Sequence, residues 1–354
     1  MNGVSRIVVA LAILSFGCDG GPTGPISPTK NPSTIPIAAI THDALFVVNG
    51  ADATVSVINT ETNVVAGTIV LKDASFPHHV YLSSDRARLL VAVPGTDLSG
   101  GHSGHSGHGG SGGGSEGAIL LLNATTGETI VSRRLPAMNH NALFSPSGKE
   151  VWTAQYDGYV LVLDPTTLAT LQSIKVGANP SEVTFSNDGR LAFVADTGSN
   201  SVTIIDAVTK NVVRTILVGN TPVGAWQGTN GIAYVDNEID GTVTAIDTAT
   251  LNITVTYTLG YVPGMAAFGP DGNLWVADSY NGRVGLWKSD ASASVGGAPA
   301  GQGAHAVAFR GDGANAYVSN QDVNTVSVID VATRRPVVTI SVGNKPNGMV
   351  WRAK

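Results

Sequence analysis

Histidine side chains are the residues of this sequence best suited to bind a metal ion. Three of them recur at a three-residue interval in the stretch GGHSGHSGHGGSGGGSEG, at His102, His105 and His108. The stretch has no apolar residue, so it cannot contribute to a hydrophobic core. Imidazole nitrogens bind zinc, copper and nickel, and histidine-rich tracts often bind metal. The tract is therefore either a solvated loop or a metal-binding tether, and the choice depends on the elements around it.

The composition limits the classes of function to consider. The chain has 354 residues, 43 % of them hydrophobic, and its 43 glycines and 17 prolines indicate many tight turns around a sizeable core. The charged fraction is 13 % and the net charge is −6. Because the chain has no basic excess, nucleic acid is not an expected partner. The single cysteine excludes an intramolecular disulfide bond.

The first residues resemble an export signal. Arg6 precedes an apolar run over residues 7–16 that is too short to span a bilayer as a helix. The stretch LSFGC resembles a bacterial lipoprotein cleavage box with a small residue before Cys18, although Ser15 stands where leucine is usual. The resemblance implies cleavage before Cys18 and its acylation, with the chain held at the periplasmic or cell-surface face of a bacterial membrane. An ordinary signal peptide with an incidental cysteine is the alternative.

Three regions follow from this pattern. We expect a signal peptide of the lipoprotein type over residues 1–17, and a lipidated Cys18 with a linker rich in Pro, Gly, Ser and Thr over residues 18–37. Such a linker cannot bury enough apolar surface to fold. Residues 38–354 form the folded domain, with the Gly/His-rich insertion at about 97–117. No later stretch is long and apolar enough for a transmembrane helix.

The folded domain consists of repeats of about forty residues. A marker residue in the first apolar run of each unit recurs at Leu82, Phe144, Phe185, Gln227, Phe268, Phe309 and Trp351. Successive markers are 41 or 42 residues apart, except the first pair, which is 62 apart. The histidine tract is therefore an insertion into one repeat.

Each repeat reads as four short strands separated by turns. The first strand, as in SEVTF, is followed by a glycine turn such as SNDGR, then by strands such as LAFVAD and SVTIID. An Asp or Asn ends the third strand at Asn59, Asn123, Asp164, Asp206, Asp247 and Asp330, and another follows the second strand at Asn49, Asp196, Asn237, Asp278 and Asn320. Because these residues recur, we interpret them as turn-forming rather than catalytic.

Seven such units predict an all-β, seven-bladed β-propeller of four-stranded antiparallel blades. The final stretch KPNGMVWRAK is a first strand without successors, so we expect it to close the ring as the innermost strand of the first sheet. The stretch IPIAAI competes for that place but lacks the Pro-x-Gly that leads into it.

The motifs AYVSN, TVSVID and VVTISVGNKP resemble the YVTN-type (YncE-like) β-propeller family, and the resemblance extends from about Thr41 onward. It implies the fold and leaves the activity open, because propellers host many functions. The stretch LWVADSYNGRVGLW is also similar to NHL-type repeats.

The repeat places the remaining histidines at one end of the central channel. The residues four before each marker are, around the ring, Asn347, His78, His140, Ser181, Val223, Gly264 and His305. Sheets seven, one, two and three are neighbours, so three imidazoles and Asn347 should form a contiguous arc. His79 is adjacent to it, Glu182 is offset by one residue, and the histidine insertion should lie on the same face. Alternatively, histidine is merely tolerated at a wet channel mouth.

The candidate metal ligands are His78, His79, His140, His305, His102, His105 and His108, with Asn347 and Glu182 as accessory residues, for Zn, Cu or Ni. No nucleophile elbow or phosphate-binding loop is present, so no catalytic residue is assigned. We therefore expect a membrane-anchored extracytoplasmic binding module, whose loop-bearing face takes a protein, a glycan or a metal ion. The alternative is a metal-dependent enzyme, lactonase-like or redox, with its site at the channel mouth. Lactonase-like propellers hold calcium with Glu, Asn and Asp, and only Glu182 and Asn347 fit that pattern.

Overall fold

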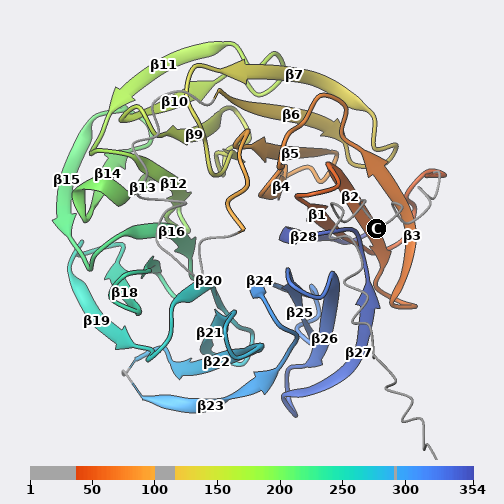
Figure 1. Cartoon of the computed structure of the whole chain (residues 1–354). Coiled ribbons are helices and arrows are strands. Elements are labelled where there is room, and N and C mark those ends of the chain that lie inside the picture. The colour runs from red at the N-terminus through yellow and green to blue at the C-terminus, as the bar shows by residue number, and fades with distance from the viewer. Residues whose placement is uncertain (1–36, 100–115, 291–292) are drawn as a thin grey trace, which may run out of the picture. The chain divides into compact units, whose positions relative to one another are not determined.

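The structure, a computed structural model, describes residues 37–99, 116–290 and 293–354, all within one compact unit, residues 32–354. These residues form seven four-stranded antiparallel sheets arranged in a ring (Figure 1). The prediction of an all-β, seven-bladed propeller is confirmed. Among the described residues only one short 3₁₀ segment, η2 (Thr197–Ser199), interrupts the strands.

The strands of each blade run from the channel outward. Blade 1 contains β28 (Pro346–Arg352), β1 (Ala44–Asn49), β2 (Thr54–Asn59) and β3 (Val64–Val70). Blade 2 contains β4 (Val80–Leu82), β5 (Arg88–Val93), β6 (Gly117–Asn123) and β7 (Thr129–Leu135). Blade 3 contains β8 (Leu143–Phe144), β9 (Val151–Gln155), β10 (Tyr159–Leu163) and β11 (Thr170–Lys175). Blade 4 contains β12 (Pro180–Phe185), β13 (Leu191–Asp196), β14 (Ser201–Asp206) and β15 (Val212–Leu217).

The last three blades repeat this order. Blade 5 contains β16 (Pro222–Gln227), β17 (Ile232–Asn237), β18 (Thr242–Asp247) and β19 (Ile253–Thr258). Blade 6 contains β20 (Pro263–Phe268), β21 (Asn273–Asp278), β22 (Arg283–Lys288) and β23 (Ser294–Pro299). Blade 7 contains β24 (Ala304–Phe309), β25 (Asn315–Asn320), β26 (Thr325–Asp330) and β27 (Arg335–Ser341).

Strand β28 closes the ring, as predicted, by pairing with β1 in blade 1. Buried Arg352 at its end donates hydrogen bonds to the carbonyl oxygens of Ala124 and, at 2.8 Å, Ile40. The described part of the competing segment, residues 37–40, forms no strand. Its Ile40 N–H instead bonds to the Thr125 carbonyl oxygen at 2.8 Å.

The core lies between adjacent blades rather than within them. Strand β13 is buried along nearly its whole length, whereas the outermost strand β15 is exposed at all but one residue. Large rings bridge neighbouring blades: Trp152 and Phe185 pack edge to face with centroids 5.3 Å apart. Because both faces of a blade are covered, its middle strands read as continuous apolar runs in the sequence.

The recurring Asp and Asn residues form turns. Asp206 Oδ1 accepts the N–H groups of Val208 at 2.9 Å and Thr209 at 2.7 Å. The same bonding recurs at Asn59, Asn123, Asp164, Asp247 and Asp330. In the second set, Asn320 Nδ2 donates to hydroxyls of the next strand, Thr325 and Ser327, both at 3.0 Å. The first set forms turns as predicted, whereas the second set joins neighbouring strands through side-chain hydrogen bonds.

The histidine insertion connects β5, which ends at Val93, to β6, which begins at Gly117. The insertion residues 100–115, with His102, His105 and His108, lie outside the described residues. So do residues 1–36, with Cys18 and the predicted signal peptide. None of the helices found among the described residues combines the length and apolar character needed to cross a membrane.

Candidate metal centre

The structure brings four histidines together from three blades. His78 and His79 precede β4 in blade 2, His140 precedes β8 in blade 3, and His305 lies in β24 of blade 7. The His78 ring lies edge-on to that of His140, with centroids 4.4 Å apart, and 5.4 Å from that of His305. The repeat phase thus identified imidazoles that are distant in sequence and close together in the structure.

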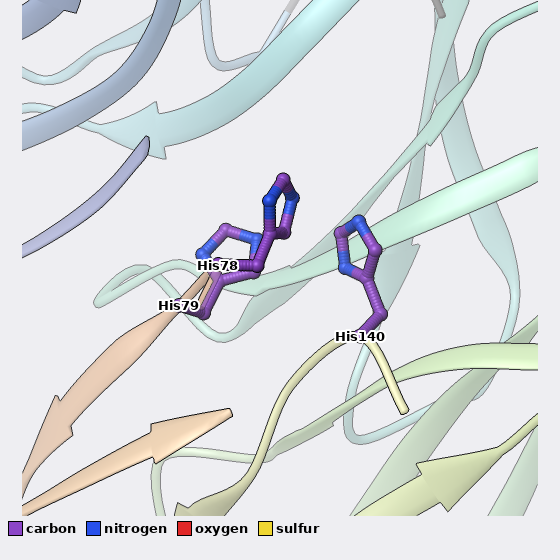
Figure 2. Close-up of side chains that lie close together, drawn as sticks. All are labelled: His78, His79 and His140. Carbon is purple, nitrogen blue, oxygen red and sulfur yellow. The ribbon is translucent and has the colours of Figure 1, made fainter. Parts of the chain in front are cut away.

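Three of these side chains have the arrangement of a metal site. His78, His79 and His140 are buried, and one ring nitrogen from each lies within 4.8 Å of the others (Figure 2). Nitrogens about 2.1 Å from a shared tetrahedral zinc ion would be about 3.4 Å apart. Binding of one ion by all three nitrogens would therefore require the nitrogens to move closer together.

The backbone around these histidines fixes their position. The His78 N–H donates to the carbonyl oxygen of Ala92 in β5 at 2.9 Å, and the Ala92 N–H donates to the His79 carbonyl oxygen at 2.9 Å. The Gly348 N–H of β28 bonds to the His78 carbonyl oxygen at 2.9 Å, which joins blades 1 and 2. Residue 348 must be glycine, because a Cβ there would lie 2.6 Å from His79 Nδ1.

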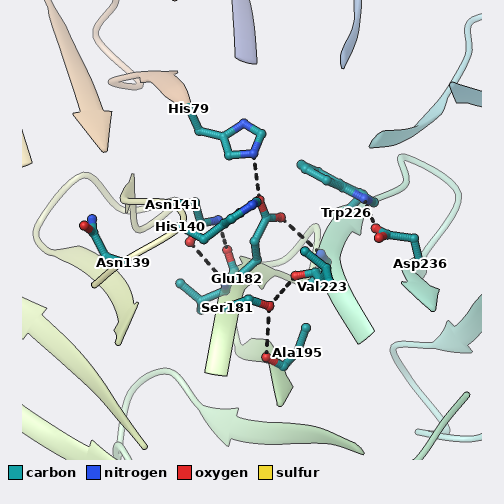
Figure 3. Close-up of polar contacts among 12 residues, drawn as sticks. His79, Asn139, His140, Asn141, Ser181, Glu182, Ala195, Val223, Trp226 and Asp236 are labelled. Atoms are coloured by element: carbon teal, nitrogen blue, oxygen red, sulfur yellow. Dashed lines mark hydrogen bonds and ion pairs between the residues drawn. The ribbon is translucent and has the colours of Figure 1, made fainter. Parts of the chain in front are cut away.

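Glu182, at the start of β12, lies between two of the rings. Its Oε1 is 2.8 Å from His140 Nδ1 and 3.0 Å from His79 Nε2, while Oε2 accepts the Ala225 N–H at 3.2 Å (Figure 3). Burial alone would raise the pKa of this carboxyl, but the neighbouring His79 and His140 outweigh it and lower the pKa to about 2. Glu182 is therefore ionised.

His140 is kept in the form that binds metal. Burial lowers the pKa of His140, and the hydrogen bond to Glu182 only partly opposes this effect. The ring is therefore neutral at neutral pH, and a neutral imidazole retains a lone pair for a metal ion.

A cavity of about 20 Å³, room for about one water molecule, opens beside the rings. It is lined by His79, His140, His305, Leu98, Val223, Gly224, Trp226, Asp236, Glu238, Pro263, Gly264 and Met265. After β5 the chain runs toward the centre of the ring (Figure 1), and this brings Leu98 to the cavity. Leu98 also packs with Met138 and Tyr156. The described stem of the histidine insertion therefore lies at the candidate metal centre.

Two acids form part of the cavity wall. Asp236 Oδ1 accepts the Trp226 Nε1–H at 2.8 Å, and burial together with the charge of Glu182 raises the Asp236 pKa to about 7. Burial and the charge of Asp236 raise the Glu238 pKa to about 8. A Cβ at residue 224 would lie 2.2 Å from Asp236 Oδ1, so any larger residue there would displace the Asp236 or Trp226 side chain. Both acids can hold or release a proton near neutral pH.

The other predicted residues have varied surroundings. His305 lines the cavity but is not one of the three histidines with close ring nitrogens. Asn347 is buried and accepts a hydrogen bond from Gln321, so it supports the boundary between blades 1 and 7. Ser181 donates to the Val223 carbonyl oxygen of the next blade.

Sequence reasoning missed Trp226, Asp236, Glu238, Met265 and Leu98. One signal was available, because Asp236 is the penultimate residue of a second strand. Small or apolar residues and one serine occupy this position in the other blades: Val48, Ala92, Ala154, Ala195, Ala277 and Ser319. An acid in that series departs from the repeat.

Comparison with known proteins shows the fold. No family model and no curated protein matches this sequence. Among solved structures, the chain is similar to the periplasmic gluconolactonase PpgL of Pseudomonas aeruginosa, with a TM-score of 0.68, 17 % identity, and 88 % of this chain and 99 % of that chain covered. A proposed 6-phosphogluconolactonase from Bacteroides uniformis has a TM-score of 0.70 at 16 % identity, covering 88 % and 100 %.

A third similar structure is the dihydro-heme d1 dehydrogenase NirN, with a TM-score of 0.61 and 15 % identity, covering 90 % of this chain and 77 % of that one. Lactonase-like propellers and a dehydrogenase are thus both similar in structure to this chain. At these identities the similarity defines the class, a seven-bladed β-propeller, and the function has to be argued from the site.

Proposed function

We propose that this protein is an extracytoplasmic binding module that captures a divalent transition metal ion with His78, His79 and His140. The observation that carries the proposal is the approach of three buried ring nitrogens to within 4.8 Å of one another. Buried imidazoles are not needed to hold the ring together, because blades 5 and 6 have Val223 and Gly264 at the equivalent positions.

The donor set favours zinc, copper(II) or nickel. Imidazole nitrogens with a nearby carboxylate suit these ions, whereas calcium and magnesium prefer sites built only from oxygen. The ionised Glu182 carboxylate, 2.8 Å from His140, adds a negative charge that attracts a cation. The cavity of about 20 Å³ leaves room for one water molecule beside the ion.

The insertion supplies a second element of the proposal. His102, His105 and His108 would capture ions loosely and deliver them to the centre, because Leu98 at the stem of the insertion lines the same cavity. Ordering a glycine-rich segment costs conformational entropy, so the affinity of the tract alone would be modest. The same face could also take a protein or a glycan.

We further propose that the protein is exported and anchored by lipid at Cys18. The apolar run before Cys18 and the fold shared with a periplasmic gluconolactonase support export. Labelling cells with a fatty-acid analogue tests the anchor: the native chain should be labelled and sediment with membranes, and Cys18→Ser should do neither. Unlabelled native protein would leave an ordinary signal peptide.

Metal content is the decisive measurement for the centre. Purified protein is dialysed against Zn(II), Cu(II) or Ni(II) and its bound metal is counted. We expect one tightly bound ion, lost in the His78→Ala/His140→Ala double variant and retained in His42→Ala, whose histidine lies outside the cluster. Deletion of residues 100–115 should remove only weak binding. If metal is lost only with that deletion, the cluster is not a metal site. If no version binds metal, the module binds a protein or glycan instead.

One observation favours a second candidate, a metal-dependent enzyme. Asp236 and Glu238 line the cavity beside the histidines, with pKa values of about 7 and 8. Acids that titrate near neutral pH suit general acid–base catalysis beside a metal-bound water. Hydrolysis of sugar lactones by the metal-loaded protein, abolished in both His140→Ala and Asp236→Asn, would establish this function. Activity that survives both substitutions would exclude this site as its source.

A further inference from the structure

Glu182 connects the elements that carry the candidate ligands. It lies in β12 of blade 4, and its carboxylate reaches His79 of blade 2, His140 of blade 3 and the Ala225 N–H of blade 5. Four of the seven blades therefore meet at one buried side chain. Both imidazoles approach the same oxygen, Oε1, while Oε2 is held by the backbone (Figure 3).

From this geometry we propose that Glu182 is the positioning residue of the metal centre: it holds His140 by Nδ1, so that Nε2 is the nitrogen offered to the metal. The proposal rests on the function proposed above. It specifies the tautomer of His140 and the nitrogen that binds the metal. It also gives a role to Glu182, which the sequence analysis placed only near the channel mouth.

The tautomer follows from the chemistry of the contact. Glu182 Oε1 lies 2.8 Å from His140 Nδ1 and 3.0 Å from His79 Nε2, which is the arrangement of one oxygen that accepts from two ring nitrogens. A contact of 2.8 Å to His140 Nδ1 is therefore favourable only when Nδ1 carries the hydrogen. A neutral imidazole has one N–H, so the lone pair is then on Nε2. Carboxylates commonly orient metal-binding histidines in this way and raise their basicity.

Separate contacts hold Glu182 and His140 in register. Asn141, next to His140, accepts the Val183 N–H at 3.2 Å and donates to the Val183 carbonyl oxygen at 2.9 Å. Val183 is the residue after Glu182. The backbones that carry the ring and the carboxylate are thus clamped together, and this limits the freedom of the 2.8 Å contact.

The surroundings of Glu182 differ from those of a carboxyl in an ordinary ion pair. The buried Asp278 is paired with Arg283 at 3.0 Å. Glu182 instead lies against two imidazoles, those of His79 and His140. An imidazole supplies a positive charge only when it is protonated, whereas a bound metal ion carries its charge at any pH.

The first test needs no metal. Nitrogen-15 NMR of the metal-free protein at pH 8 reports which ring nitrogen of His140 carries the hydrogen. We expect the Nδ1–H form in the native protein and loss of that preference in Glu182→Leu. A native His140 in the Nε2–H form would overturn the proposal, even if every variant failed to fold.

The second test measures affinity. Glu182→Gln keeps the size of the side chain and removes its charge, and Zn(II) binding should weaken by about 10–100-fold, as for other orienting partners of metal-bound histidines. The matched control is Asp196→Asn, a buried carboxyl of the same blade whose equivalents in other blades are already asparagine: Asn49, Asn237 and Asn320. This control should bind Zn(II) like the native protein.

The outcomes separate the two proposals. If the native protein binds Zn(II) and Glu182→Gln binds it equally well, the positioning role is wrong and the metal site remains. If the native protein binds no metal, the proposed function is wrong, and the His140 tautomer still decides the role of Glu182. If Asp196→Asn weakens binding as much as Glu182→Gln, the effect is a general consequence of altering blade 4, and the positioning role is again wrong.

Discussion

The difference in unfolding free energy between the Asp236→Asn variant and the native protein should depend on pH. It should favour the variant more at pH 8 than at pH 5. The pKa of Asp236 is about 7, against an ordinary 3.8, so the folded protein keeps a proton that the unfolded chain releases between these values. The free energy of unfolding of the native protein therefore falls as pH rises from about 4 to about 7. A difference of about three in pKa corresponds to about 4 kcal/mol.

Asparagine removes this dependence because its amide never ionises. Its Oδ1 can still accept the Trp226 Nε1–H, which now lies 2.8 Å from the carboxyl oxygen. Its Nδ2–H₂ needs an acceptor, so at pH 5 the variant should be equal to the native protein or less stable by about 1–3 kcal/mol. At pH 8 the variant should have gained about 3 kcal/mol relative to that difference, because only the part of the pKa difference that lies above pH 5 is sampled between these two pH values.

Urea unfolding followed by tryptophan fluorescence, with a chelator present, gives both free energies. The control is Glu61→Gln, at an exposed residue, which should change the free energy of unfolding by the same amount at the two pH values. If Asp236→Asn changed the free energy of unfolding equally at pH 5 and pH 8, Asp236 would be ionised in the folded protein at both pH values. The raised pKa of Asp236 in the cavity wall would then be wrong.

Three further predictions test the scaffold and the access to the site. Asp206→Ala should lower the urea midpoint of unfolding through the loss of two turn hydrogen bonds, with Zn(II) affinity unchanged; altered affinity would contradict a purely structural role. Arg352→Met should cost about 2–4 kcal/mol, because two carbonyl oxygens lose their buried donor, and an unchanged melting profile would refute its role in ring closure. Leu98→Ala should speed chelator removal of bound metal in stopped-flow measurements, since Leu98 lines the cavity, and equal rates would place the route elsewhere.

The repeat made much of the fold predictable. Strand types, the number of blades and closure by β28 all follow from a period of about forty residues, because each unit repeats the same buried and exposed positions. The phase of the repeat also gave the position of His78, His140 and His305, since equivalent residues of a ring lie at equal depth. Recurrence likewise separated structural acids such as Asp206 from candidates for chemistry.

The contacts within the site could not be predicted in the same way. The repeat fixes the depth of a residue along the channel but does not fix where a long side chain ends, so the contact of Glu182 with two rings required coordinates. Leu98 lies in a connection that has no equivalent in other blades, and no periodic argument applies to it. Asp236 was detectable as a departure from the repeat, but its effect depends on burial, which the sequence does not report.

The pairing of β1 with β28 has a consequence for how the chain acquires its structure. As a polypeptide emerges from the ribosome, blades 2 to 7 can each assemble from consecutive strands soon after synthesis. Blade 1 has to wait with an unpaired edge until a segment about 300 residues later arrives, and such edges invite association with other chains. Newly made molecules should therefore depend on a chaperone, or on rapid completion of synthesis, during that interval.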